Sequence, residues 1–165
     1  HPYFAHPGRV HAPNGEYVPP AAFLTRRSAV YTDPLELTEP LVELVNPKLS
    51  EARRAAVEVA GPRLGSETAD NLALAVSEIV TNASLYGRPP VELRLWAGPD
   101  RVIATIRDGG DGVVDTSFGL EPVDTDRSGG RGLWIAGQLC DHLSINRTDA
   151  GSEIRLVAGT PTATR

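Results

Sequence analysis

Two glycine clusters on either side of a polar loop constrain the fold of this chain more than any other feature. The first, Asp108-Gly109-Gly110-Asp111-Gly112, directly follows a strand-like run, and the second, Gly129-Gly130-Arg131-Gly132, opens an apolar helix. Asp-Gly favours a hairpin turn, yet mostly polar residues, 113–128, follow the first cluster in place of an alternating strand. Backbone N–H groups at a helix start, unobstructed where glycine stands, form a ready site for phosphate. The clusters therefore predict a pocket whose lid, residues 113–128, becomes ordered when phosphate binds.

The apolar pattern around these clusters predicts helices first and mostly antiparallel strands after them. One helix carries apolar residues from Leu49 to Ala60 and is expected to stop at Gly61-Pro62, and a second runs from Ser66 to Ala83. Next come alternating runs at 91–97 and 101–107, an apolar helix at 133–139, and strand-like runs at 143–147 and 153–158. This order predicts an α+β fold with the helices on one face of the sheet.

The first forty residues differ in composition from the rest of the chain. They hold seven of the 14 prolines, which predicts an arm or linker over 1–40, a domain over 41–158 and a tail over 159–165. His1, His6 and His11 lie in this arm, but their spacing matches no zinc pattern. The 165 residues contain no methionine, so we expect the chain to be part of a longer protein.

The charge balance argues against two classes of partner. The net charge is -5 and the isoelectric point is near 5.3, so broad attraction to nucleic acid or to anionic lipid is not expected. No apolar stretch approaches the ~18 residues of a membrane span. The single cysteine, Cys140, cannot form an internal disulfide, which fits a reducing compartment. We therefore expect a cytoplasmic protein that binds neither DNA nor membrane directly.

Two polar residues on the second helix are candidates for a cleft. Glu78 and Asn82 are four residues apart and flank an apolar stripe, so both project from one side of the helix at the rim of the core. An alternative is an ordinary boundary pair satisfied by neighbouring backbone. Other patterns are less informative: no P-loop or dinucleotide-binding fingerprint fits, and the adjacent Cys140, Asp141 and His142 do not suggest a catalytic triad.

Taken together, Glu-x-x-x-Asn on a helix, Asp-x-Gly-x-Gly after a strand and Gly-x-Gly-Leu at a helix start resemble the three boxes of the GHKL ATP-binding fold. Their order and spacing match as well. The stretches 74–83 and 130–141 resemble those of bacterial anti-sigma factor kinases of the RsbW and SpoIIAB type. The resemblance covers roughly residues 35–158. It implies a two-layer α/β sandwich of the GHKL (Bergerat) type that holds ATP between its helices and its sheet.

The resemblance also implies roles for individual residues. Asn82 is expected to hold Mg²⁺ against the phosphates, and Glu78 to accept the proton of an attacking hydroxyl. Asp108 is expected to bind the adenine amine. Six further residues are expected to lie against the adenine base or the phosphates: Gly110, Gly112, Gly130, Arg131, Gly132 and Leu133. A basic residue on the first helix, either Arg53 or Arg54, is expected to stabilise charge on the transferred phosphoryl group.

The implied function is that of an ATP-dependent anti-sigma factor. Such a protein sequesters a sigma factor, phosphorylates a serine of an anti-anti-sigma (STAS) protein, and often forms a homodimer. Two alternatives are a partner-sequestering module that binds ATP without transferring phosphate, and the catalytic domain of a histidine kinase. One departure concerns the phosphate contacts, because this chain has Tyr86 where many relatives place a histidine four residues after the asparagine.

Overall fold

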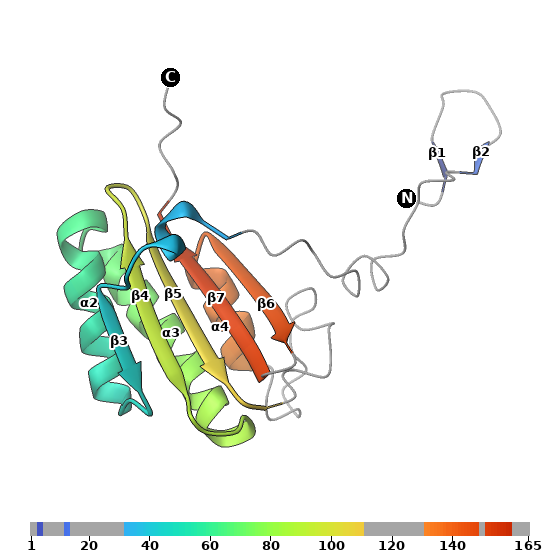
Figure 1. The fold of residues 1–165 in the computed structure, drawn as a ribbon. Helices are drawn as coiled ribbons and strands as arrows, with labels where there is room; N and C mark the ends of the chain where they lie inside the picture. Colours follow the sequence, from blue (N-terminus) through green and yellow to red (C-terminus); the bar gives the residue numbers. More distant parts are fainter. Residues whose placement is uncertain (1–2, 5–11, 14–31, 111–130, 149–150, 160–165) are drawn as a thin grey trace. The chain divides into compact units, whose positions relative to one another are not determined.

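A computed structural model describes residues 3–4, 12–13, 32–110, 131–148 and 151–159 (Figure 1). The chain divides into two units, residues 1–31 and residues 32–165. In the first unit, β1 (Tyr3–Phe4) pairs with β2 (Ala12–Pro13) in antiparallel orientation. Every other described element belongs to the second unit, whose first residue is Thr32, whereas the sequence analysis placed the start of the domain at Leu41.

The second unit is built on a five-stranded sheet. Its order is β3-β4-β5-β7-β6, and each neighbouring pair is antiparallel. The strands are β3 (Val42–Val45), β4 (Glu92–Ala97), β5 (Val102–Asp108), β6 (His142–Thr148) and β7 (Gly151–Ala158). Strand β7 lies between β5 and β6. Because β5 and β7 are antiparallel, Ser152 near the start of β7 lies opposite Asp108 at the end of β5.

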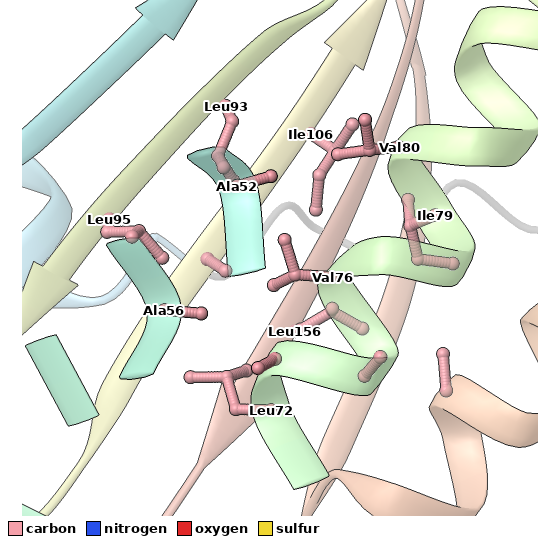
Figure 2. Close-up of a cluster of buried hydrophobic side chains, with 14 of the residues drawn as sticks. Ala52, Ala56, Leu72, Val76, Ile79, Val80, Leu93, Leu95, Ile106 and Leu156 are labelled. Carbon is pink, nitrogen blue, oxygen red and sulfur yellow. The ribbon is translucent and has the colours of Figure 1, made fainter. Parts of the chain in front are cut away.

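Three helices cover one face of this sheet: α2 (Leu49–Leu64), α3 (Ser66–Tyr86) and α4 (Arg131–Leu139) (Figure 1). Figure 2 shows the interface between the layers, where Ala56 of α2 lies beside Leu95 of β4 and Leu72 of α3 lies beside Leu156 of β7. All four side chains are fully buried. Apolar residues at spacings of three and four on α3, and at alternate positions on the strands, supply the two faces of this core. The predicted α+β sandwich is confirmed.

The sequence placed the end of the first helix wrongly. Instead of stopping at Gly61-Pro62, α2 continues through Pro62 to Leu64 and ends at Gly65, whose φ is 84°. Pro62 deprives one carbonyl in the last turn of its usual N–H donor, but only two helical residues follow it. Arg63 Nη1 donates to the Val59 carbonyl oxygen at 2.9 Å and satisfies part of this helix end. Proline therefore does not stop the helix here, because it lies in the last turn at an exposed helix end.

The opposite face of the sheet, called the outer face below, is partly covered by a 3₁₀ helix, η1 (Pro34–Leu37). Leu35 packs there against Trp96, Ile103 and Val157. Cover on both faces explains why β5 is buried at every position from Val102 to Ile106. None of the described helices has the length and apolar character needed to cross a membrane.

Candidate functional site

Helices α3 and α4 bring three of the predicted residues into one place. A Cβ atom built on Gly132 would lie 2.7 Å from Glu78 Oε2 and 3.1 Å from Asn82 Nδ2. Both side chains are half-buried, as expected for residues at the rim of the apolar stripe. Gly132 itself is buried in the first turn of α4. The space that a side chain would occupy at Gly132 is thus the space between a carboxylate and an amide.

The polar groups of α3 differ in how they are satisfied. The hydroxyls of Ser77, Thr81 and Ser84 each donate to the carbonyl four residues earlier, at 2.9, 2.8 and 2.8 Å. Among the described residues, by contrast, the side chains of Glu78 and Asn82 form no hydrogen bond or ion pair. A boundary pair satisfied by neighbouring backbone would have such partners. Within the described residues, neither side chain has the backbone partner that this alternative requires.

Asp108 is held by three donors at the end of β5. Its Oδ1 atom accepts from the Gly110 N–H at 2.7 Å and from the Arg88 N–H at 3.4 Å. Its Oδ2 atom accepts from the Ser152 hydroxyl at 2.8 Å. Each carboxylate oxygen offers about two lone-pair sites, so the donors of the described residues leave one site on Oδ2. Asp108 is half-buried, and it can therefore accept one further hydrogen bond from a ligand at a fixed position.

Close backbone contacts fix the same carboxylate in place. A Cβ on Gly87 would lie 2.5 Å from Asp108 Oδ1, and one on Gly110 would lie 2.7 Å from it. Gly151 has a φ of 138°, and a Cβ there would collide with the Asp108 carbonyl oxygen. The end of α3, the turn after β5 and the start of β7 meet around Asp108 because glycine stands at each approach. Sequence reasoning did not identify Gly87 or Ser152 as part of this site.

The two groups of residues lie at successive positions along α3. Glu78 and Asn82 mark one end, and Gly87, which caps the helix and touches Asp108, marks the other. At 1.5 Å per residue, the nine steps from Glu78 to Gly87 span about 13 Å. Tyr86, which is 63% exposed, lies one turn after Asn82 between them. The arrangement suits an elongated ligand with a hydrogen-bond donor at the Asp108 end and a cation or a proton donor at the end that carries Glu78 and Asn82.

The other predicted residues are distributed as follows. Leu133 is buried, and Arg131 is exposed at the start of α4. Arg53 and Arg54 are exposed on α2, where Arg54 Nε lies 3.9 Å from Glu58 Oε1. No described contact joins either arginine to Glu78 or Asn82. Gly112, Gly130, the predicted lid at 113–128 and the three arm histidines lie outside the described residues.

The charged and titratable groups of the described residues bear on two other kinds of site, a cysteine nucleophile and a metal-binding cluster. Burial, together with the neighbouring Asp141 charge, raises the pKa of the Cys140 thiol to about 12, so this group is not a thiolate nucleophile near neutral pH. Within the ranges that the structure describes, no three or more His, Cys, Asp or Glu side chains gather in a way that could hold a metal ion. The amide oxygen of Asn82 is a suitable Mg²⁺ ligand, provided that a bound ligand supplies further oxygens.

The sequence model of a family described as the histidine kinase-like ATPase domain matches residues 44–158. No curated protein matches the chain.

Similar solved structures include the mycobacterial sensor histidine kinase MprB, at 21% identity over 72% of this chain and 96% of that one, with a TM-score of 0.46. The histidine kinase domain of the Escherichia coli osmosensor EnvZ is 19% identical over 78% and 94%, with a TM-score of 0.43. That of a blue-light activated histidine kinase from Erythrobacter litoralis is 22% identical over 67% and 60%, with a TM-score of 0.44. None of these TM-scores reaches 0.5, so the family match alone bears on function.

Proposed function

The chain belongs to the histidine kinase-like ATPase domain family, and we propose that it binds ATP between α3, α4 and the ends of β5 and β7 and donates the γ-phosphate to a separate acceptor. The observation that carries this proposal is the meeting of Glu78, Asn82 and Gly132, with the carboxylate and the amide lacking partners among the described residues. We call the space between these two side chains the cradle, and a methyl group at Gly132 would fill it.

Adenine is expected at the Asp108 end of the site. The remaining lone pair on Asp108 Oδ2 accepts the exocyclic amine, while the Ser152 hydroxyl and the Gly110 N–H hold the carboxylate still. Guanine presents a carbonyl oxygen at the corresponding position, and two acceptors facing each other repel. The site should therefore prefer ATP to GTP.

The phosphates are expected at the other end, against the first turn of α4. When bound, Mg-ATP supplies the transferable phosphoryl group. Asn82 offers an amide oxygen to the cation, and the N–H groups of the first turn of α4, which have no partner within the helix, favour negative charge. Glu78 lies within reach of the same space and is suited to accept a proton from the attacking group or to orient that group.

Two kinds of acceptor are compatible with this arrangement. The family match favours the first, in which the domain phosphorylates a histidine located in another segment or another chain. The second is a serine of a STAS protein, in an anti-sigma factor that also sequesters a sigma factor. The sequence stretches 74–83 and 130–141, which resemble those of anti-sigma kinases, support this second candidate. A module that binds ATP and sequesters a partner without transferring phosphate is the third candidate.

Labelled ATP distinguishes these candidates. The purified chain is incubated with γ-labelled ATP, Mg²⁺ and either STAS proteins or phospho-acceptor domains of histidine kinases, and the product is then treated with acid. Acid-labile label on an acceptor domain supports the histidine kinase type, and acid-stable label on a STAS protein supports the serine kinase. ATP binding without label on either acceptor supports the sequestering module. Asn82→Ala serves as the inactive control, and a parent chain that does not bind ATP contradicts the proposal altogether.

A further inference from the structure

Residues 33–38 form a short element on the outer face that we call the clasp. The clasp consists of η1 with its flanking residues Asp33 and Thr38. It precedes residues 44–158, the part of the chain that the family model matches. In the sequence it lies within residues 1–40, the proline-rich segment expected to be an arm or linker. Because it is outside the matched range, its contacts with the sheet need an explanation of their own.

Two acidic residues build the clasp before they touch the sheet. Asp33 Oδ1 accepts from the Leu35 N–H at 3.0 Å, and Glu36 Oε1 accepts from the Asp33 N–H at 3.0 Å. This reciprocal arrangement is a capping box, which satisfies the free N–H groups at the start of the helix. Pro34 in the first turn presets a helical φ. The sequence Asp-Pro-Leu-Glu thus specifies the local conformation by itself.

The same two carboxylates form ion pairs with the sheet. Asp33 binds Arg101 through two bonds, Nη2 to Oδ1 at 2.8 Å and Nε to Oδ2 at 2.9 Å. Glu36 Oε1 accepts from Arg155 Nε at 2.8 Å. The Arg155 and Glu36 side chains are only 6% and 12% exposed, and those of Arg101 and Asp33 only 16% and 7%. Pairs so well shielded from water are far less screened than the exposed pairs elsewhere on the sheet.

Apolar contacts hold the middle of the clasp against the outer face of the sheet. Leu35 packs against the cluster of Trp96, Ile103 and Val157, which come from three neighbouring strands. A Cβ built on Gly98 would lie 3.2 Å from Leu35 Cδ1, so the glycine leaves room for this side chain. The Trp96 indole N–H donates to the Thr38 carbonyl oxygen at 3.0 Å. The clasp therefore joins β4, β5 and β7 from the side opposite the helices.

Two of these strands also carry the adenine end of the candidate site. Arg101 directly precedes β5, and Asp108 ends it, while Arg155 and Ser152 both lie on β7. In the β5–β7 ladder, Thr105 is opposite Arg155 and Asp108 is opposite Ser152. Three residues of an extended strand cover about 10 Å, so the clasp grips β7 roughly that far from Ser152. The Ser152–Asp108 hydrogen bond depends on the alignment of these two strands.

We propose that Asp33 and Glu36 are positioning residues for nucleotide binding, which hold β5 and β7 through Arg101 and Arg155 in the alignment that sets Asp108 against Ser152. The inference rests on the proposed binding of ATP. If the inference holds, the clasp is energetically linked to adenine recognition at the far ends of the same strands. By the reciprocity of linked equilibria, ATP should also hold the clasp more tightly to the sheet.

Calorimetric titration with ATP and with GTP tests the inference on the full chain. Glu36→Gln should raise the Kd for ATP about three- to tenfold and reduce the preference for ATP over GTP. A variant that is merely less stable would lose affinity for both nucleotides equally. The matched control is Glu43→Gln, which breaks an ion pair with Arg94 on the same face but in β3 and β4, and it should bind as the parent does. In the parent, hydrogen exchange at residues 35–38 should slow when ATP is added.

The outcomes separate the inference from the proposed function. A parent chain that binds no ATP overturns both. If the parent binds ATP and folded Glu36→Gln binds it with the same Kd and the same preference over GTP, the inference alone is wrong. If Glu36→Gln does not fold, Asp33→Asn carries the same test, because it neutralises the other carboxylate of the clasp without changing its size. Equal binding by folded Asp33→Asn and by the parent would then overturn the inference.

Discussion

At the scale of single residues, Asp108 is the group whose surroundings most sharply define a ligand. Asp108→Asn should lower ATP affinity about tenfold or more, because the amide presents a donor to the adenine amine in place of an acceptor. The Ser152 hydroxyl can turn to accept from that amide, so the fold should tolerate the change. Titration calorimetry measures the effect, with Asp70→Asn, an exposed site on the same helix as Glu78, as control. Unchanged affinity in folded Asp108→Asn would remove the adenine role.

Two glycines of α4 provide a second test at this scale. Gly132→Ala should abolish ATP binding, because its methyl group would sit 2.7 Å from Glu78 Oε2 in the cradle. Gly137→Ala meets nothing within 4 Å and should stabilise the helix by about 0.5–1 kcal/mol. Thermal unfolding and ATP titration of both variants give the comparison. Equal ATP binding by the two would show that the space beside Gly132 does not hold a ligand.

Some of these site residues can be predicted from the sequence and others cannot, for a physical reason. Glu78 and Asn82 are four apart on one helix, and helical geometry alone puts them side by side. Ser152 reaches Asp108 across a strand pairing that joins positions forty-four apart in the sequence, and no local pattern predicts that pairing. Gly87 matters because its backbone touches Asp108, which a sequence shows only as a helix end. Local spacing is therefore readable, whereas contacts made by the tertiary fold are not.

At the scale of secondary-structure elements, the clasp makes a prediction about acid. The Arg101 guanidinium, which hydrogen-bonds Asp33, holds the pKa of that carboxyl below its ordinary value. A carboxyl with a lowered pKa in the folded state stabilises the fold above its unfolded pKa of about 3.9, and this contribution is lost as pH falls through the lower folded value. Asp33→Asn should thus lower Tm at pH 6 and show a smaller further loss at pH 3 than the parent.

Thermal unfolding at both pH values measures this difference. Glu43→Gln, which removes an exposed carboxylate from an ion pair on the same face, is the matched control and should follow the parent closely. Parallel pH profiles for Asp33→Asn and the parent would show that Asp33 does not contribute to the acid sensitivity. The clasp was not recognised in the sequence, where residues 33–38 fell inside the predicted arm, because its partners are arginines on strands far along the chain.

The predicted lid is a second element with a testable role. Residues 113–128 contain Asp115, Glu121, Asp124 and Asp126 between two glycine clusters, and such crowding of like charge opposes burial of the loop on its own. We expect the triphosphate to order it through the N–H groups of the second cluster. Hydrogen exchange across 113–128 should therefore slow when Mg-ATP is added. Equal protection with and without nucleotide would mean that the loop does not respond to ATP.

At the scale of the whole molecule, the site joins elements from both layers, so a ligand there should stabilise the entire second unit. In the proposed site, helices α3 and α4 supply the phosphate end, and β5 and β7 supply the adenine end. A ligand that binds only the folded state at about 100 times its Kd adds about 2.7 kcal/mol of stability. For a unit of this size, Mg-ATP should therefore raise Tm by about 5 to 10 °C.

Substitutions of Glu78 and Asn82 should have different effects, the first on phosphate transfer and the second on the stabilisation by Mg-ATP. Glu78→Ala should keep most of the Tm increase and lose phosphotransfer by about 10²-fold or more if the carboxylate acts on the proton of the attacking group. Asn82→Ala should lose the part of the increase that requires Mg²⁺, because it removes the amide oxygen offered to the cation. Thermal unfolding with ATP, with and without Mg²⁺ and in the presence of chelator, measures the second effect, and label transfer measures the first. If both variants merely unfold at lower temperature and keep the same response to Mg-ATP as the parent, the two side chains serve the rim of the core and not the nucleotide.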